Sequence, residues 1–165
     1  MSLLEICQAL QNSETGLAIH ESLYFFPIIE TMHVLGLSVS VGTIFWFDIR
    51  ALGIGMRRQR VSEVFASVKP WMLAGFIMMV VTGAFMFWAR AADAYANTFF
   101  RIKVTGMALT VVNALYFHFK TQNTMAEWDA APTPPLAVRM AGVFSIILWL
   151  TIITAGRLMA YTFAI

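Results

Sequence analysis

The sequence predicts an all-α integral membrane protein, a four-helix bundle preceded by a short N-terminal amphipathic helix on the membrane surface. Three observations predict this fold class. Of the 165 residues, 59% are hydrophobic and only 12% are charged, whereas about a quarter of the residues of a soluble domain are charged. Four apolar stretches reach the roughly 20 residues that a bilayer crossing needs. The connections between them are short, so neighbouring helices run antiparallel in a single domain over residues 1–165.

The first predicted element is the surface helix, over about residues 1–22. Asn12 and Ser13 predict a break in it, and residues 13–16 predict a turn. The segment contains no Lys or Arg and no uninterrupted apolar core, so it does not match a cleavable signal peptide. A disordered polar leader is the alternative. Apolar residues recur with the weakly amphipathic spacing typical of an interfacial helix at Leu3, Leu4, Cys7 and Leu10.

The four spans follow in order along the chain. The second begins after Pro70, a residue that suits the first turn of a helix. The fourth begins after the run Pro132-Thr133-Pro134-Pro135, which stops a preceding helix. The predicted spans cover about residues 24–52, 71–90, 98–120 and 136–163.

Positive charge is distributed unevenly between the two sides of the predicted bundle. The side with both termini has only Arg90, Arg101 and Arg157. Because Lys and Arg accumulate in cytoplasmic loops, the sequence predicts a multi-pass protein of a bacterial inner (cytoplasmic) membrane, with both termini extracytoplasmic. The opposite side, between spans one and two and between spans three and four, holds Arg50, Arg57, Arg58, Arg60, Lys69, Lys120 and Arg139.

Ionisable side chains inside the predicted spans are the candidate functional groups, because charge at membrane depth is expensive. Glu30 and His33 share one face of the first span, and neutral imidazole is the commonest metal ligand in proteins. At about 1.5 Å of rise per residue, His33 and Lys103 lie at similar levels in the outer half of the bundle, whereas His118 lies roughly 22 Å deeper than Lys103. His118 is therefore not expected to ligate the opposite face of a haem that His33 holds. The alternative for His118 is that its side chain reaches water or lipid headgroups at the membrane surface.

These positions predict a b-type haem in the outer half of the bundle, with His33 as the metal-binding axial ligand. Lys103 is the predicted opposing group or ligand, and His20 reaches the site if the surface helix folds inward. Bundle cores commonly house such cofactors, and axial ligands set the potential of a haem.

The groups predicted to support the haem are cations and one acid. Arg101 and Arg157 suit the propionates, because guanidinium binds carboxylates bidentately. Glu30 is level with Arg157, and the two are predicted to form an ion pair. The alternative is that Glu30, His33, Lys103 and Arg157 form an ion-pair network that only joins helices.

Several other function classes are excluded by composition. The single cysteine, Cys7, rules out an internal disulfide and an iron–sulfur cluster built from this chain alone. Basic segments with interleaved aromatic residues are absent, so nucleic acid is not an expected partner. No nucleophile with its base, phosphate loop or hydrolytic zinc motif is present.

Over nearly its whole length the chain resembles a family of small bacterial four-helix membrane proteins that has no settled activity. The residues that carry the resemblance are Glu30-x-x-His33-x-Leu35-Gly36, Asp48-Ile49-Arg50, Pro70-Trp71, Thr82-Gly83, Asn97-x-x-Phe100-Arg101-x-Lys103, Asn113-Ala114, Phe117-His118 and Gly156-Arg157.

The order of His33-x-x-Gly36, Pro70-Trp71, Lys103 and His118 is similar to that of the HemJ-type protoporphyrinogen oxidases and of the copper-resistance D-type membrane proteins. The HemJ resemblance implies bound haem b, with a first-span histidine and a third-span lysine as key site residues. These correspond to His33 and Lys103. The spacing from the lysine to the following histidine differs from that of the HemJ type.

The sequence thus predicts a cytochrome b-like protein that transfers electrons, with quinone as a candidate partner. A HemJ-like porphyrinogen oxidase is the first alternative, and a cofactor-free structural subunit of a larger membrane complex is the second. The expected surroundings are membrane lipid and either other membrane subunits or further copies of the chain.

Overall fold

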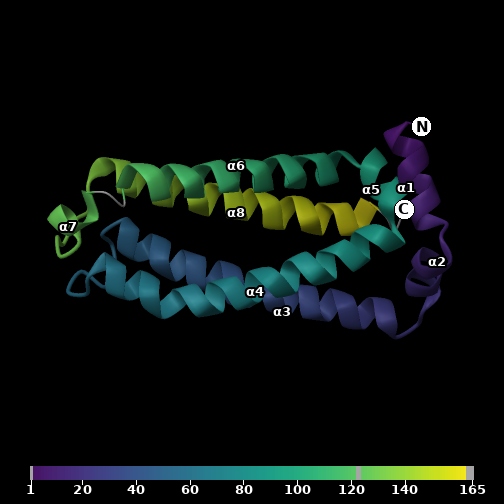
Figure 1. Cartoon of the computed structure of the whole chain (residues 1–165), viewed down its shortest axis with the longest axis horizontal. Coiled ribbons are helices and arrows are strands. Elements are labelled where there is room, and N and C mark those ends of the chain that lie inside the picture. Colours follow the sequence, from purple (N-terminus) through teal and green to yellow (C-terminus); the bar gives the residue numbers. More distant parts are fainter. Residues whose placement is uncertain (1, 122–123, 163–165) are drawn as a thin grey trace.

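Four long helices dominate the computed structural model, which describes residues 2–121 and 124–162. They run side by side along the long axis of the molecule (Figure 1). Each is long and apolar enough to cross a membrane, and the described residues contain no strand, which confirms the predicted all-α class. The four helices are α3 (Phe25–Ala51), α4 (Val61–Ala89), α6 (Thr98–Thr121) and α8 (Leu136–Thr162).

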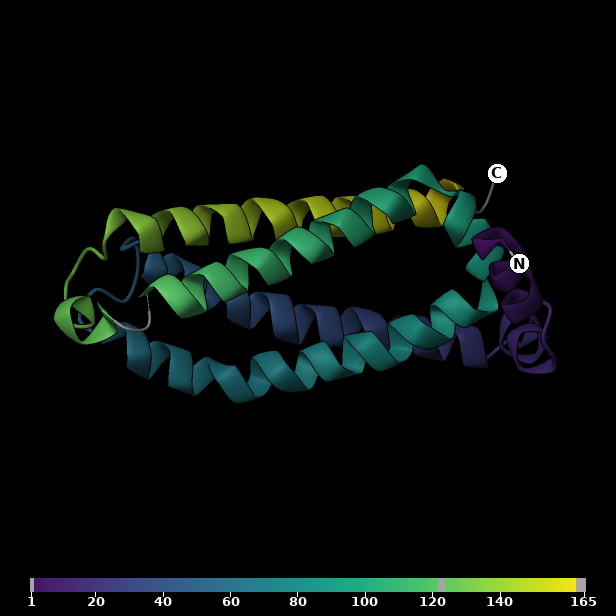
Figure 2. The ribbon, with the colours of Figure 1, turned by 45° about the horizontal axis from the view of Figure 1, so that its top comes forward.

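The bundle consists of two helix pairs. Helix α3 packs along α4 and α6 packs along α8, while the contact between the pairs runs mainly through α3 and α8 (Figure 2). Small residues permit the close approach of α3 and α4. A Cβ atom added at Gly75 would lie 2.6 Å from the backbone nitrogen of Ser40 and 2.7 Å from the carbonyl oxygen of Gly36. The two backbones therefore meet directly at this crossing.

The N-terminal segment forms two helices instead of the single predicted surface helix. Helix α1 (Leu3–Gln11) ends at Asn12, and α2 (Glu14–Glu21) begins after Ser13. The predicted break at these two residues is confirmed. The predicted turn at residues 13–16 is wrong, because the Ser13 hydroxyl accepts a hydrogen bond from the Gly16 N–H and so caps the first turn of α2.

Helices α1 and α2 lie against the end of the bundle that carries both termini (Figure 1). The indole N–H of Trp88, near the end of α4, donates to the Ser13 hydroxyl over 3.0 Å. The side-chain carbonyl of Gln11 accepts from the backbone N–H of Ala92 over 2.8 Å, in the first turn of the short helix α5 (Ala91–Ala96). The segment is thus anchored to the bundle by hydrogen bonds as well as by apolar contacts.

Helix α4 begins at Val61, well before the predicted start of the second span, and Pro70 lies inside it instead of in its first turn. The reason is a cap supplied from the other loop. Asp129, which follows the short helix α7 (Met125–Trp128), accepts hydrogen bonds from the Ser62 N–H over 2.8 Å and from the Ser62 hydroxyl over 2.6 Å. These bonds satisfy groups that a helix N-terminus otherwise leaves unpaired.

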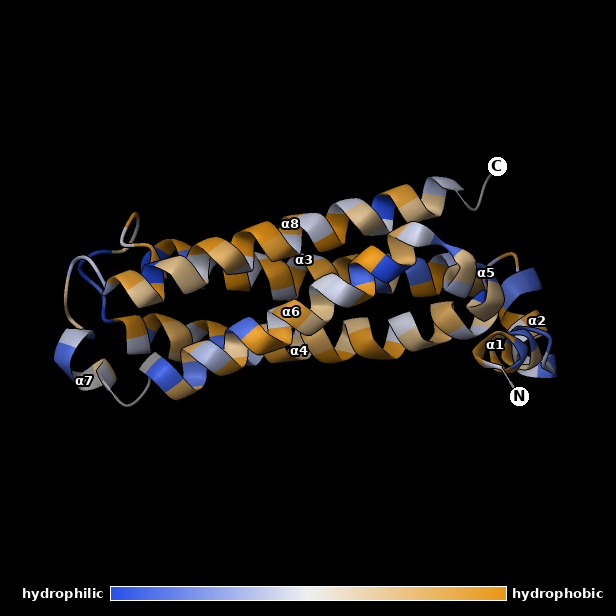
Figure 3. Cartoon of the chain, turned by 90° about the horizontal axis from the view of Figure 1, so that it is seen from above, coloured by the Kyte–Doolittle hydropathy of each residue, from blue (hydrophilic) through white to orange (hydrophobic). Residues whose placement is uncertain are grey.

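Arg50 joins the two loops at this end of the bundle. Its side chain is fully buried. Its Nε donates to the Gln59 carbonyl over 2.8 Å, and one Nη donates to the Ala131 carbonyl over 3.0 Å. Figure 3 shows hydrophobic residues along the long helices and hydrophilic ones gathered towards the two ends. Arg50 therefore lies where the apolar bundle gives way to polar loops.

The carboxyl group of Asp129 belongs to the same network. Partial burial favours its neutral form, but the hydrogen bonds from Ser62 and the charges of Arg60 and Arg50 outweigh that effect. Together they hold the pKa of the Asp129 carboxyl below its usual range. The loop contacts are therefore strongest when this carboxylate is ionised.

Candidate functional site

His33 lies in the half of α3 nearer the termini, and its ring is oriented by α4. The Nδ1 atom lies 2.9 Å from the Thr82 hydroxyl oxygen. That hydroxyl donates to the Met78 carbonyl over 2.6 Å, so its oxygen is left to accept from Nδ1–H. From this network we assign the proton of the neutral ring to Nδ1, which leaves the lone pair of Nε2 available.

A glycine makes room for the imidazole against α4. A Cβ atom added at Gly83 would lie 3.3 Å from Cε1 of His33, tighter than ordinary van der Waals contact. Thr82 and Gly83 thus have complementary roles, because the first holds the ring by a hydrogen bond and the second leaves space beside it. The pair Thr82-Gly83 thus accounts for the close contact of the imidazole with α4.

Lys103 lies across from His33, on α6. It is half-buried, and it is close enough to His33 for their charges to interact. Its stem passes over Gly156 of α8, where an added Cβ would lie 3.8 Å from Nζ. Within residues 2–121 and 124–162 the structure gives the Lys103 ammonium no hydrogen-bond or ion-pair partner. The two residues that the depth calculation put level are therefore brought together by the fold.

The predicted ion pair between Glu30 and Arg157 is wrong. Arg157 is exposed, its guanidinium carbon lies 5.5 Å from the centre of the Tyr161 ring, and one Nη lies 3.4 Å from the Tyr161 hydroxyl. Tyr161 is one turn further along the same helix, so this contact forms without any rearrangement between helices. Glu30 is half-buried on α3.

The remaining predicted residues lie at the ends of the bundle. Arg101 is exposed, and its guanidinium donates to the Tyr95 carbonyl over 3.3 Å. His20 is exposed in the last turn of α2 and is not turned inward. His118 is in the last turn of α6, at the loop end, where its ring contacts Phe119 edge-on. The separation of His118 from His33 agrees with the depth calculation.

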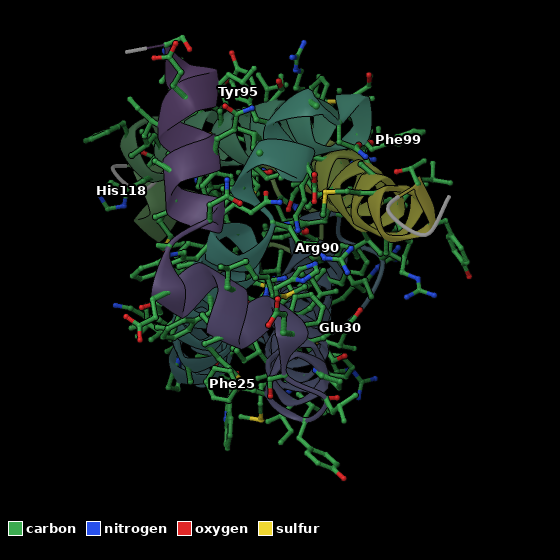
Figure 4. The ribbon with its side chains drawn as sticks, turned by 90° about the vertical axis from the view of Figure 1, so that its right-hand side faces the viewer. Phe25, Glu30, Arg90, Tyr95, Phe99 and His118 are labelled. Carbon is green, nitrogen blue, oxygen red and sulfur yellow. The ribbon has the colours of Figure 1, made fainter. Side chains whose placement is uncertain are left out.

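Arg90, which the charge pattern marked only as one of the few basic residues on the side of the termini, lies near the centre of the end view (Figure 4). Its guanidinium carbon is 5.3 Å from the centre of the Phe26 ring. It stands at the junction of α4 and α5 and is half-buried. Both arginines lie near the end of a span, so the sequence did not distinguish the half-buried Arg90 from the exposed Arg157.

The donor set around His33 suits a metal complex that brings its own ligands. Among the described residues there is no group of three or more His, Cys, Asp or Glu side chains that could hold a metal ion. A protein site for a bare zinc or copper ion needs several such ligands. A porphyrin supplies four nitrogens to its iron and needs only axial ligands from the protein. His33 is a single half-buried imidazole, the kind of axial ligand that a haem takes from a protein.

The fold and the site define a helical protein of the membrane type, in which a histidine on one helix pair faces a lysine on the other. The chain belongs to a family of unknown function, DUF6644, whose sequence profile matches residues 22–162. Comparisons with curated proteins and with solved structures found no match. They lend no support to the resemblance to the HemJ-type and copper-resistance D-type proteins.

Proposed function

We propose that this protein is a b-type haem protein of the bacterial inner membrane that transfers electrons. The observation that carries the proposal is the hydrogen bonding of the His33 imidazole, which fixes its tautomer. Its Nδ1–H is held by the Thr82 hydroxyl, and Nε2 has no hydrogen-bond partner within the described part of the chain. Histidines that ligate metals nearly always donate their other ring N–H in this way, which fixes the tautomer and the ring orientation.

The surroundings of His33 fit a planar group between the two helix pairs. The backbones of α4 and α6 lie apart, because the pairs meet chiefly through α3 and α8, and the rings of Phe87 and Phe100 stack between α4 and α6 at 5.6 Å. Glycines lie beside both facing residues, Gly83 beside His33 and Gly156 beside Lys103. When bound, haem would supply a one-electron redox centre, and His33 would hold its iron. Lys103 would be the opposing group or ligand.

Cations at the same end of the bundle would receive the two propionates. Arg101 and Arg157 were predicted for this role, and both are exposed at that end. Arg90 is a third candidate because it is directed inward (Figure 4). In the predicted orientation this end faces outward, so electrons would pass between quinone in the membrane and an extracytoplasmic partner or a neighbouring subunit.

One observation favours a second candidate, a HemJ-like porphyrinogen oxidase. The Lys103 ammonium has no carboxylate partner within the described part of the chain, and it lies near His33. An unpaired lysine is suited to binding the carboxylates of a porphyrinogen or to accepting a proton. Turnover of a porphyrinogen by the purified protein would distinguish this enzyme from a carrier of electrons.

The proposal is tested by the absorption spectrum of the protein purified from cells with ample haem. We expect a Soret band and reduced-minus-oxidised bands of a b-type cytochrome. A folded protein with no Soret absorption would refute the haem proposal and would leave the cofactor-free structural subunit as the better description.

A further inference from the structure

Asp48 is a buried carboxyl that the proposed haem site does not use. It lies on α3, one turn before the helix ends at Ala51, and therefore at the loop end of the bundle. Its side chain is 4% exposed. The Ser145 hydroxyl of α8 is near enough to interact with it, while its Oδ2 atom has no hydrogen-bond partner among the described residues. The carboxyl group is thus enclosed, and at least one of its oxygens is unsatisfied.

No basic side chain compensates a negative charge at this position. On α3 itself, Arg50 is turned to the loop carbonyls of Gln59 and Ala131. On α8, Arg139 is exposed, and on α4 the charged residues Glu63 and Lys69 are exposed as well.

On α6, the polar residue near this level is Asn113. Its amide donates to the Ala141 carbonyl of α8 over 3.0 Å, beside Gly142, where an added Cβ would lie 3.5 Å from the Asp48 carbonyl oxygen. Lys120, further along α6, is exposed. Among the described residues, therefore, only the neutral Ser145 hydroxyl supports the Asp48 carboxyl.

An ionised carboxylate with a free oxygen is strongly disfavoured in such a place, because burying a charge without a partner is far more costly than burying a neutral acid. We propose that Asp48 is a proton-binding site, which carries its proton in the resting protein and exchanges it with the solution at the loop end. The exchange path is short, since Asp48 lies one helical turn from the end of α3 and one turn is only about 5 Å long. The inference does not depend on haem.

Infrared spectroscopy of the membrane-reconstituted full chain tests this directly. At neutral pH we expect the C=O stretching band of a protonated carboxylic acid, which disappears in Asp48→Asn and moves to lower frequency in D₂O. Glu30→Gln, a change in a half-buried acid at the other end of the bundle, should leave the band in place. Absence of an Asp48-dependent band would show an ionised carboxylate and overturn the proposal. A band that does not shift in D₂O would overturn the exchange.

Isotope labelling keeps the test valid if Asp48→Asn fails to fold. The chain has three aspartates, Asp48, Asp93 and Asp129. Asp93 is exposed, and the pKa of Asp129 is held below its usual range, so Asp48 is the enclosed aspartate of the three. Protein labelled with ¹³C at the aspartate carboxyl should therefore show the protonated band shifted by the isotope. An unshifted band would assign the proton to a glutamate and contradict the proposal.

Discussion

The Nδ1 atom of His33 lies 2.9 Å from the hydroxyl oxygen of Thr82, so a residue of α4 determines how an imidazole of α3 is turned. The hydroxyl itself is fixed by its bond to the Met78 carbonyl. The chain of three groups sets the tautomer of the ring and leaves the lone pair on Nε2. Nε2 is therefore the atom through which His33 would bind a ligand.

Removing the Thr82 hydroxyl should loosen the imidazole without opening the core. In Thr82→Val we expect haem affinity to fall about 10- to 100-fold, the usual effect of losing the partner of a metal-ligating histidine. Titration of the apoprotein with haem, followed at the Soret band, measures this. Thr82→Ser keeps the hydroxyl and should bind nearly as well as the wild type. Equal affinity of the valine and serine variants would mean that the hydrogen bond does not matter to the site.

The contact of α3 with α4 should be intolerant of a single methyl group at its crossing. We expect Gly75→Ala to destabilise the protein by about 1–3 kcal/mol, as overpacking of a tight interior does, because the added Cβ meets backbone atoms at 2.6 Å and 2.7 Å. Thermal unfolding in detergent gives the comparison.

Gly42 supplies the matched control for this substitution. It lies on the same helix pair, and a Cβ there meets nothing within 4 Å. Gly42→Ala should be neutral or slightly stabilising, because alanine favours a helix over glycine by up to about 1 kcal/mol. A loss of stability as large in Gly42→Ala as in Gly75→Ala would show that packing at the crossing is not the cause.

Hydrophobic length and helical period were sufficient to predict the four long helices and the shared level of His33 and Lys103, because both depend only on distance along a helix. They were not sufficient to identify partners. The helical period places Arg157 at the outer end of the bundle. It does not predict that the Arg157 guanidinium contacts Tyr161 of the same helix. The early start of α4 was missed because its cap, Asp129, comes from a distant loop. Thr82 carried no signal beyond its place in the motif with Gly83.

The loop end should become less stable in acid because of Asp129. Its pKa is lowered from the ordinary value of 3.8 in the folded protein, so its contribution is complete above that value. The contribution is then lost as the pH falls through the lower folded-state pKa. We expect limited proteolysis of the loops to accelerate over this range. Asp129→Asn should be cleaved faster at neutral pH and should lose most of this acid dependence, whereas Glu127→Gln, an exposed neighbour, should behave like the wild type.

The charge distribution predicts which side of the membrane each end occupies. Both termini should be extracytoplasmic and the loop that carries Arg57, Arg58 and Arg60 cytoplasmic, since Lys and Arg collect on the cytoplasmic side. The structure has both termini at one end and this loop at the other (Figure 1). Reporter fusions at the C-terminus and within the loop measure the orientation. A cytoplasmic C-terminus would reverse it.

The most direct test of the central claim compares the Soret bands of two purified histidine variants. His33→Ala removes the proposed axial ligand, and His118→Ala removes a histidine at the opposite end of the bundle. We expect the first variant to lose the Soret band while it remains a folded helical membrane protein, and the second to keep the band unchanged. A full Soret band in His33→Ala, or its loss in His118→Ala alone, would contradict the account.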